Sequence, residues 1–463
     1  MRTPLLSTVV ALSLLAATQA GCAAPRGPAP SSLPTTPPMG WNSWNSGIDL
    51  TEENVKATVD AMVSSGMRDA GYRYVNLDAG WAAPRRGSRG ELQADPARFP
   101  GGIPAVARYA HDRGMMLGVY ASPYDEGCSA QPALASIGHE TLDAQTFAAW
   151  GVDYLKYDWC RAEANHDEQK QVFSRMRDAL RATGRPIVYS INPNSSDDYT
   201  AGSRYDWSGI ADLTRATTDL VPVWRDTLPP LGPLDPFASG AYRGVPDEFS
   251  VAEKVVTGSK PGYWADPDMM VVGVGWDEFV ARHFPSIRDG LTVGDVPGDQ
   301  VAQLRAMAAL SDDQLAHILL QQPNLTDTEQ RAHLSLWAML SAPLIAGNDV
   351  RSMTPQTRDI LTNREVIAVD QDPRVAPAHP LPTDGRVATK QLSDGGVAVA
   401  FFNAGENPVT INTSAAEAGL GPAPCYAVRD LWAHTDTKTT GAVTSGVVPP
   451  HAVTLLRASP VCR

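Results

Sequence analysis

Short apolar runs alternate with stretches of helical periodicity between residues 38 and 373. Eight apolar runs predict strands, at residues 40–44, 72–78, 116–121, 152–158, 186–192, 212–219, 262–269 and 344–349. Between them, apolar residues spaced three and four apart predict helices, at residues 52–65, 103–113, 167–182 and 326–341. Eight strands with intervening helices fit a closed parallel barrel better than an open sheet. The pattern therefore predicts a (β/α)8 TIM barrel over residues 38–373.

The pattern changes after residue 373. Little helical periodicity remains, and apolar alternation broken by turn residues runs through segments 385–402, 408–412, 425–431 and 447–456. Such spacing is typical of a compact antiparallel β-sandwich, which we predict for residues 374–463. The expected fold is thus α/β, a TIM barrel followed by a sandwich.

The N-terminus predicts export. Arg2 precedes an apolar run over residues 5–17, which is short for a bilayer span and is followed by a Pro- and Ala-rich stretch. We interpret residues 1–22 as a signal peptide and residues 23–37 as an extended tether. The Ala-Gly before Cys22 resembles a bacterial lipoprotein cleavage site, in which Cys22 is lipidated. Ordinary secretion is the alternative, since Gln19 stands where that pattern prefers a Leu-like residue. Either places the protein outside the cell, secreted or lipid-anchored at the outer face of the membrane.

The net charge and the number of cysteines argue against some kinds of partner and indicate the compartment. The net charge is −13 with no Lys/Arg cluster, which argues against a nucleic-acid partner. Five cysteines are an odd number for an exported protein. If Cys22 carries lipid, four remain, and these can form two pairs in an oxidising compartment. The nine His are scattered without ligand spacing and no phosphate-binding Gly loop occurs, so we expect no metal and no cofactor.

Two predicted strands end in a carboxylate. Asp158 closes the run 152–158 and Asp219 closes the run 212–219. Taken alone, either is interpreted most simply as a loop salt bridge. Together they suggest glycosidic bond cleavage, which needs one carboxyl to attack the anomeric carbon and one to protonate the leaving oxygen.

Over almost all of residues 37–457 the chain resembles glycoside hydrolase family 27, the α-galactosidase family. The resemblance rests on six motifs in the family's order: Pro-Pro-Met-Gly-Trp-Asn-Ser-Trp-Asn at 37–45, Asn-Leu-Asp-Ala-Gly-Trp at 76–81, Thr-Phe-Ala-Ala-Trp-Gly-Val-Asp-Tyr-Leu-Lys-Tyr-Asp-Trp-Cys at 146–160, Arg-x-x-x-Asp at 215–219, Trp-Ala-Asp-Pro-Asp-Met at 264–269 and Leu-Ser-Leu-Trp-Ala-Met-Leu-Ser-Ala-Pro-Leu-Ile-Ala-Gly-Asn-Asp at 334–349. Asp-Leu-Trp-Ala-His at 430–434 also looks like the family's sandwich.

The resemblance implies a retaining double displacement with Asp158 as nucleophile and Asp219 as acid/base. Such a pair lies about 5–5.5 Å apart, where two carboxyls disfavour double ionisation, so Asp219 holds a proton while Asp158 stays charged. Lys156 is expected to keep Asp158 ionised and to bond a sugar hydroxyl. Arg215 is expected near the 2-hydroxyl.

Further positions match sugar contacts of the family. Trp41 and Tyr120 correspond to the aromatic wall of the sugar site, with core packing as the alternative for both. Asp78 corresponds to a carboxylate that grips the 4- and 6-hydroxyls. Asp268 corresponds to another sugar-contacting position, with a purely structural role as the alternative.

Two disulfides are expected. Cys128 and Cys160 match the family's disulfide beside the nucleophile. Cys425 and Cys462 both lie in the predicted sandwich and are expected to staple its last strand.

The departures from the family pattern concern sugar recognition. Ala79 replaces the second Asp of an Asp-Asp pair, and Asn192 stands in a Ser-Ile-Asn-Pro run (190–193) where the family has Cys-Glu-Trp near the 2-hydroxyl. The loop 121–126 is not Asp-rich. Residues 273–324 look like an insertion of about fifty residues, with a helix expected at 300–320 that could rim the mouth.

The leading hypothesis is a retaining exo-α-glycosidase of α-galactosidase type, acting on an oligo- or polysaccharide with an α-linked terminal sugar. The alternatives within the family are an isomaltodextranase-like α-1,6-glucan hydrolase and a β-L-arabinopyranosidase. A cell-surface carbohydrate-binding protein that has lost catalysis is the alternative of another class. Because Ala79 and Asn192 weaken the grip on galactose, we expect weak activity on aryl α-galactosides. Better activity is expected on a different or extended α-linked substrate, with dextran-type α-1,6-glucan the first to try.

Overall fold

The computed structural model describes residues 32–124, 128, 132–225, 240, 242–280, 282–283 and 322–460. Its central sheet is parallel and has eight strands: β1 Met39–Asn42, β2 Tyr74–Leu77, β3 Met116–Ala121, β4 Tyr154–Asp158, β5 Val188–Asn192, β6 Leu213–Arg215, β9 Trp264–Asp266 and β10 Leu344–Ala346. Most residues of these strands are buried, because the sheet is covered on its outside by helices and filled on its inside by side chains.

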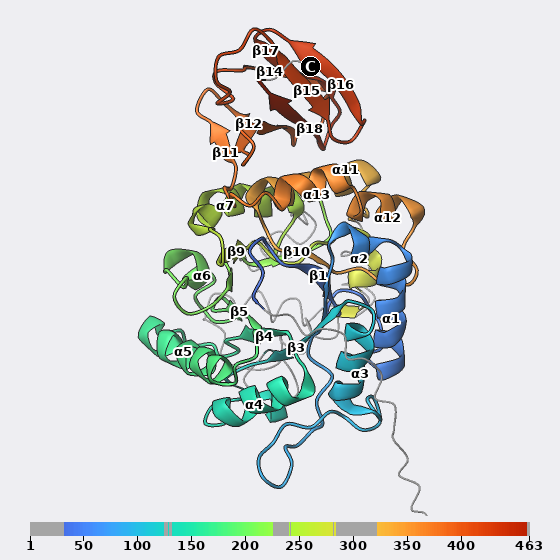
Figure 1. The fold of residues 1–463 in the computed structure, drawn as a ribbon, viewed down its shortest axis with the longest axis vertical. Coiled ribbons are helices and arrows are strands. Elements are labelled where there is room, and N and C mark those ends of the chain that lie inside the picture. The colour runs from blue at the N-terminus through green and yellow to red at the C-terminus, as the bar shows by residue number, and fades with distance from the viewer. Residues whose placement is uncertain are drawn as a thin grey trace, which may run out of the picture.

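The sheet curls into the predicted TIM barrel (Figure 1). Its strand order is β10-β1-β2-β3-β4-β5-β6-β9. The two outer strands approach each other through a parallel bridge between Met270 and Ala346. There the Met270 amide donates to the Ile345 carbonyl at 2.7 Å. The predicted barrel is therefore confirmed.

Helices connect the strands around the outside: α1 Glu52–Ser64, α2 Met67–Ala70, α3 Gly102–His111, α4 Glu140–Trp150, α5 His166–Ala182, α6 Ala201–Arg204, α7 Val245–Val255, α11 Asp327–Leu340, α12 Pro355–Leu361 and α13 Arg364–Asp370, with 3-10 turns η1 Pro132–Leu134 and η4 Val256–Gly258. The four predicted helices are confirmed to within two residues at each end. Their starts are set by capping. Thr51 and Asn165 cap α1 and α5, and Thr326 forms a capping box with Glu329 at α11.

The strand predicted over 212–219 is wrong in its second half. The barrel strand β6 ends at Arg215, and Asp219 lies on a separate two-residue strand, β7 Asp219–Leu220, which pairs with β8 Tyr242–Arg243. The Asn194 side chain is the physical reason. Its amide donates to the carbonyls of Arg215 (3.2 Å) and Thr217 (2.9 Å), which the sheet would otherwise pair.

The C-terminal domain is the predicted sandwich. Its strands are β11 His379–Leu381, β12 Asp384–Gln391, β13 Val397–Asn403, β14 Val409–Ser414, β15 Tyr426–Asp430, β16 Thr435–Thr439, β17 Ala442–Val448 and β18 Ala452–Ser459. Six of them form an antiparallel sheet in the order β11-β12-β13-β18-β15-β16, and β14 pairs with β17. Val399, Phe401 and Ile411 lie in the apolar core of this domain.

The sandwich docks on the barrel through α11, which lies between the two in Figure 1. The Lys390 ammonium donates to the Ala338 carbonyl at 2.8 Å, and the Trp432 indole donates to Ser335 at 2.8 Å. The Asn363 amide, which precedes α13, donates to the Leu431 carbonyl at 3.0 Å. These buried polar contacts hold the two domains in one arrangement.

The segment expected as a tether is attached at its end. The Thr36 hydroxyl donates to the side-chain oxygen of Gln371 at 2.8 Å, and the Gln371 amide donates to the Pro37 carbonyl at 2.9 Å. Its earlier residues up to 31, with Cys22, lie outside the described residues. Among the described helices, none is long and apolar enough to cross a membrane.

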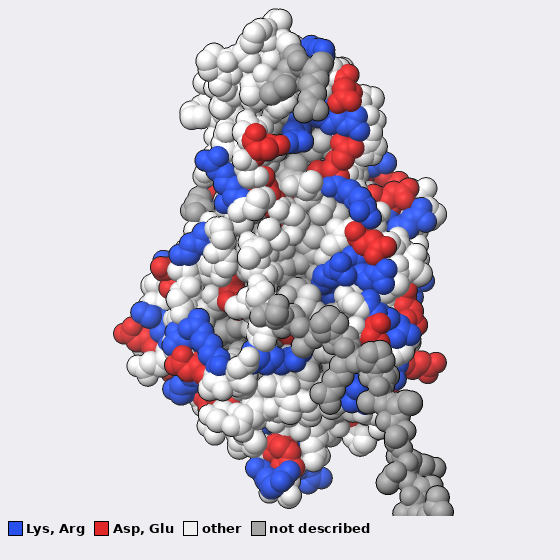
Figure 2. All heavy atoms as spheres, in the orientation of Figure 1, with Lys and Arg blue, Asp and Glu red and all other residues white. Residues whose placement is uncertain are grey.

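Acidic and basic side chains are interspersed on the face of the molecule shown in Figure 2. No continuous basic stripe is visible among the described residues on that face.

Candidate active site

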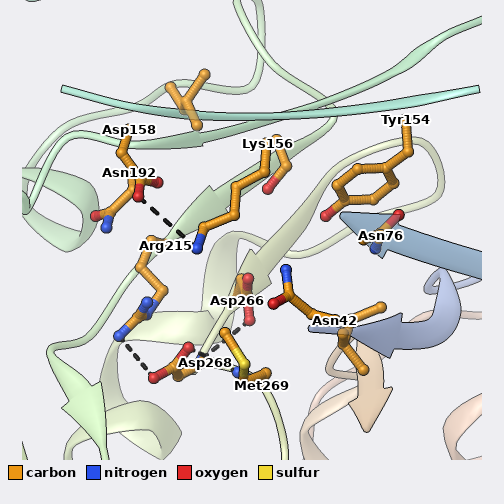
Figure 3. A pocket seen from close by; sticks show the side chains of 13 residues that line it. Asn42, Asn76, Tyr154, Lys156, Asp158, Asn192, Arg215, Asp266, Asp268 and Met269 are labelled. Atoms are coloured by element: carbon orange, nitrogen blue, oxygen red, sulfur yellow. Dashed lines mark hydrogen bonds and ion pairs between the residues drawn. The ribbon is translucent and has the colours of Figure 1, made fainter. Parts of the chain in front are cut away.

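The side chains that define the site come from alternate residues of β4. Tyr154, Lys156 and Asp158 point toward the barrel interior, since side chains two apart share one face of a strand (Figure 3). The residues between them face outward, where Tyr157 packs against Phe173 of α5. The Lys-x-Asp spacing in the sequence therefore delivers a cation and a carboxylate to the same hollow.

Asp158 belongs to a cluster of charged side chains with Lys156 and Asp78. The Lys156 ammonium lies 3.8 Å from the Asp158 carboxylate and 2.7 Å from that of Asp78. Asn42, at the end of β1, donates to Asp78 at 2.9 Å. Lys156 thus bridges two buried carboxylates, as a cation must when two negative charges are placed within one hollow.

The pKa of Asp158 reflects this environment. Burial raises its pKa to about 6; Lys156 opposes the rise, while the charge of Asp78 adds to it. For Lys156 burial alone would lower the pKa, but the charges of Asp158 and Asp78 outweigh burial and raise it. Lys156 is therefore held as a cation, and it pulls the Asp158 pKa back without restoring its ordinary value.

A second cluster of charged side chains is centred on Arg215, at the end of β6. Its guanidinium lies 2.8 Å from the Asp219 carboxylate and 2.9 Å from that of Asp268. Asp268 also accepts from the Leu220 amide at 2.9 Å, and so ties the β7 strand to the barrel. The Asp219 side chain is 61% exposed, whereas that of Arg215 is 8% exposed. Arg215 thus connects the open edge of the site to its buried part.

Asp268 adopts a left-handed backbone conformation with φ of 84°. Its amide donates to the Asp266 carboxylate at 2.9 Å, and the Trp337 indole donates to its carbonyl at 3.0 Å. Non-glycine residues with this φ are uncommon and persist where surrounding contacts hold them. Burial raises the pKa of Asp268 and Arg215 opposes the rise.

The two clusters of charged side chains border one hollow of about 420 Å³, part of it open to solvent. Its lining consists of Asn42, Asn76, Tyr154, Lys156, Asp158, Ser190, Ile191, Asn192, Arg215, Asp266, Asp268, Met269 and Ile345. Five of the residues selected from the sequence line it: Lys156, Asp158, Asn192, Arg215 and Asp268. Polar atoms of Asp158 (Oδ1), Asn76 (Oδ1) and Arg215 (Nε) are buried there without a hydrogen-bond partner. Buried polar atoms normally have partners, so the hollow is built for a polar ligand.

Sequence reasoning missed Asn42, Asn76, Tyr154, Ser190 and Asp266. Period-two alternation on β4 would have found Tyr154. For Asn76 the only indication is a glycine on the neighbouring strand, Gly118 of β3. A Cβ at that position would overlap the Asn76 side-chain amide. Glycine at this position gives the side chain its room.

Trp41 and Tyr120 are buried beside the hollow and are not among its lining residues. The Trp41 indole donates to the Asn348 carbonyl at 2.8 Å. The Tyr120 hydroxyl lies 3.1 Å from the Cys160 sulfur. The position of Trp41 agrees with core packing, the alternative weighed for it. Tyr120 lies against the charged residues of the site: the Lys156 ammonium is 5.4 Å from the centroid of its ring, and the charges of Asp158 and Asp78 add to burial in raising its pKa. Asp78 contacts the lining residue Lys156, and Asp219 contacts the lining residue Arg215, but neither carboxylate lines the hollow itself.

The Cys128–Cys160 disulfide is confirmed, with the two Cα atoms 5.1 Å apart. It ties the loop after β3 to the end of β4, next to the nucleophile candidate. Cys462 lies outside the described residues, so the Cys425–Cys462 bond stays a prediction. Among the described residues, no group of three or more His, Cys, Asp or Glu side chains is placed to hold a metal ion.

We expect kcat/KM to fall as the pH drops below about 6. The Asp158 pKa is raised to about 6, and only the ionised carboxylate can attack, so activity is present above this pH and lost below it. A solvent-exposed Asp would hold its charge to about pH 4. The measurement is kcat/KM from pH 4 to 8. Lys156→Met should move the acidic limb to higher pH, and a wild-type limb near pH 4 would contradict the buried-carboxylate account.

Comparisons with known proteins identify the family of the chain. The family model described as alpha galactosidase A matches residues 36–279 and 303–372, and the alpha galactosidase C-terminal beta sandwich domain matches residues 383–458. The alpha-galactosidase A of Cellvibrio japonicus is 32% identical over 443 residues, covering 92% of this chain and 93% of that protein.

Solved structures show the same architecture. Alpha-galactosidase I from Mortierella vinacea superposes with a TM-score of 0.73 at 28% identity, covering 95% of this chain and all (100%) of that one. The alpha-galactosidase of Saccharomyces cerevisiae, determined with raffinose, gives 0.71 at 25% identity, covering 92% of this chain and 98% of that one.

The family match also corrects the expected insertion over 273–324. Matching stops at residue 279 and resumes at 303, so the unmatched stretch is residues 280–302, about half of what was expected. Val274, Trp276 and Phe279 are buried in the barrel core, and the Trp276 amide donates to Asn324 at 2.6 Å. The helix expected at 300–320 lies outside the described residues, as does most of the loop 125–131.

Proposed function

Because the chain belongs to glycoside hydrolase family 27, the α-galactosidase family, and is a hydrolase of O-glycosyl bonds, we propose that it removes terminal α-galactosyl residues from oligosaccharides with retention of configuration. One observation carries the proposal. A buried carboxylate, Asp158, lies in the hollow with an unpartnered oxygen, while a second, exposed carboxylate, Asp219, lies 2.8 Å from Arg215, which lines the same hollow.

In the first step, an Asp158 oxygen forms a bond to the anomeric carbon as the bond to the leaving oxygen breaks, and Asp219 gives that oxygen its proton. In the second step, Asp219 takes a proton from water, whose oxygen displaces Asp158 from the anomeric carbon. Two inversions return the starting configuration. Lys156 balances the charge of the Asp158 carboxylate, and Arg215 balances Asp219 after it has given up its proton.

The position of the hollow supports an exo mode of action. In a TIM barrel the interior is packed with side chains, so a hollow at the carboxyl ends of the strands is closed below and open only at the mouth. A terminal sugar can enter such a hollow, whereas an internal unit of a chain would have to pass through the barrel.

Ala79 bears on the choice of sugar. It follows Asp78 directly and offers a methyl group where a second carboxylate would contact the 4- and 6-hydroxyls. A hydrogen bond to a charged group contributes about 1.5–3 kcal/mol, so its loss weakens the hold on galactose. β-L-arabinopyranose lacks the hydroxymethyl group of galactose and loses less, which makes a β-L-arabinopyranoside the second candidate.

Because the matching relatives are α-galactosidases, one of them solved with raffinose, we place an α-galactoside ahead of the dextran-type glucan that Ala79 and Asn192 alone suggested. We expect raffinose to be hydrolysed with the highest kcat/KM in a panel that also holds an α-glucoside, a β-L-arabinopyranoside and dextran. Aryl α-galactosides should be turned over more weakly than raffinose. Steady-state kinetics on each compound test this. A higher efficiency on dextran or on the arabinopyranoside would reassign the sugar while leaving the two carboxylates in their roles.

We propose, in addition, that the protein is exported and held at the outer face of the membrane by lipid on Cys22. The support is the apolar run before Cys22 and the Pro-rich stretch after it. Mass spectrometry of the mature N-terminus from the native host tests this, and an unmodified Cys22 within a longer N-terminus would contradict it.

A further inference from the structure

Asp219 is not held by the barrel sheet. Asp158 ends β4, a strand of that sheet, whereas Asp219 lies on β7, which pairs with β8 in a two-stranded sheet of its own. The Asp219 side chain is also 61% exposed. The position of this carboxylate is therefore determined by its ion pair with Arg215 and by what β7 and β8 are packed against.

The chain that follows Asp219 is tied to the segment that leads into α7. The Val221 amide donates to the Arg243 carbonyl at 2.9 Å. Two residues further on, the Val223 carbonyl accepts from the Val245 amide at 3.0 Å. A segment fixed in this way has little freedom to absorb a shift at its far end, so a displacement there is passed on to Asp219.

That far end is Trp224, which contacts the sandwich. Trp224 is buried, and the centroid of its ring lies 5.0 Å from that of His451 and 6.1 Å from that of Phe402, two residues of the sandwich. Phe249 of α7 also lies 5.8 Å from Phe402. The unit that carries Asp219 is therefore seated against the sandwich by aromatic packing, and α7 lies directly below that domain in Figure 1.

His451 is held in one orientation. Its Nδ1 lies 2.7 Å from a carboxylate oxygen of Glu329 on α11, and its Nε2 lies 3.2 Å from a carboxylate oxygen of Glu406. Only the doubly protonated ring can donate to both carboxylates. The Trp224 ring stacks on the His451 ring at an interplanar angle of 21°. Two carboxylates thus fix the ring plane against which the indole rests, and a protonated ring on an indole face adds a cation–π attraction.

We propose that Trp224 and His451 are positioning residues for Asp219, through which the sandwich domain determines where the acid/base carboxylate stands. Trp224 holds the outer end of the segment and His451 holds Trp224, so that the proton of Asp219 meets the leaving oxygen along a fixed direction. Neither residue needs to contact the sugar. The inference rests on the proposed function, in which Asp219 protonates the leaving oxygen.

The test compares two substrates that differ in their need for the acid. Raffinose has a sugar oxygen as its leaving group and needs the proton, whereas α-galactosyl fluoride needs it little. Trp224→Ala should lower the ratio of kcat/KM for raffinose to kcat/KM for the fluoride about 10-fold, and His451→Ala about 5-fold, because a small misplacement of a general acid costs much of its contribution. Trp224→Phe, which keeps an aromatic ring, should lose less.

Trp432 provides a matched control. It is also an aromatic contact between the domains, but its indole donates to Ser335 of α11, at 2.8 Å, and not to the segment that carries Asp219. Trp432→Ala should lower the melting temperature and leave the ratio unchanged. Because loss of folded protein lowers both activities alike, the ratio reports only on the molecules that remain folded.

A second measurement asks whether Trp224 acts through Asp219. In the Asp219→Ala protein there is no carboxylate to position, so adding Trp224→Ala should leave kcat/KM for raffinose unchanged. A further loss of the same size as in the wild-type background would overturn the positioning role.

The outcomes separate this inference from the proposed function. Wild-type protein that hydrolyses neither substrate overturns both. Wild-type protein that hydrolyses both, with a ratio that Trp224→Ala and His451→Ala leave unchanged or that Trp432→Ala lowers as far, overturns the positioning role alone.

Discussion

Asp158→Asn should lower kcat by at least about four orders of magnitude on every substrate, because an amide cannot form the glycosyl ester on which the reaction depends. The structure makes this expectation sharp. The Asp158 carboxylate has an unpartnered buried oxygen facing the hollow and is balanced by Lys156 at 3.8 Å. The variant removes the nucleophile while keeping nearly the same shape. Single-turnover and steady-state rates on α-galactosyl fluoride measure the loss.

A matched control separates chemistry from folding. Asp212 is also a largely buried carboxyl, and it accepts from the Tyr189 amide at 2.8 Å, but it precedes β6 and so lies at the opposite end of the barrel from the site. Asp212→Asn should cost stability and leave kcat within a few-fold of wild type. Near-normal turnover by Asp158→Asn would remove Asp158 from the role of nucleophile.

Asp219→Ala should show a different loss, one that depends on the leaving group. Without an acid, raffinose hydrolysis should fall by about 10²–10⁴-fold, whereas formation of the glycosyl enzyme from the fluoride should be much less affected, since fluoride departs with little need of a proton. Water then lacks its base in the second step. Added azide, which needs no base, should raise the rate and yield a galactosyl azide.

The Asp219 substitution also releases its partner. Arg215 would lose the ion pair at 2.8 Å but keep that to Asp268 at 2.9 Å, so the buried guanidinium stays compensated and the fold should persist. Loss of activity that is equal for both substrates and is not relieved by azide would contradict the acid/base assignment.

The sequence predicted best where a short pattern determines structure on its own. Alternation on β4 places Lys156 and Asp158 on one face whatever surrounds them. Apolar spacing alone located the helices, and the structure shows that Thr51, Asn165 and Thr326 cap three of them. The barrel followed from the order of such elements.

The sequence predicted poorly where contacts between residues far apart in the chain determine the local structure. The break between Arg215 and Asp219 is due to Asn194, which lies on another part of the chain and takes the carbonyls that would have continued β6. The burial of Trp41 beneath the hollow depends on a contact with Asn348, some three hundred residues away. Resemblance to a family shows which residues correspond, but it does not show where their side chains lie; that requires the structure.

The account is tested most directly by trapping the glycosyl enzyme. A 5-fluoro-α-galactosyl fluoride forms the covalent intermediate faster than water can remove it, because the second fluorine slows the positively charged transition state of release. We expect peptide mass spectrometry of the inactivated protein to find the fluorosugar on Asp158 and on no other residue. A label on a different carboxylate, or full inactivation with no covalent sugar, would contradict the assignment of Asp158 as the nucleophile of a retaining hydrolase.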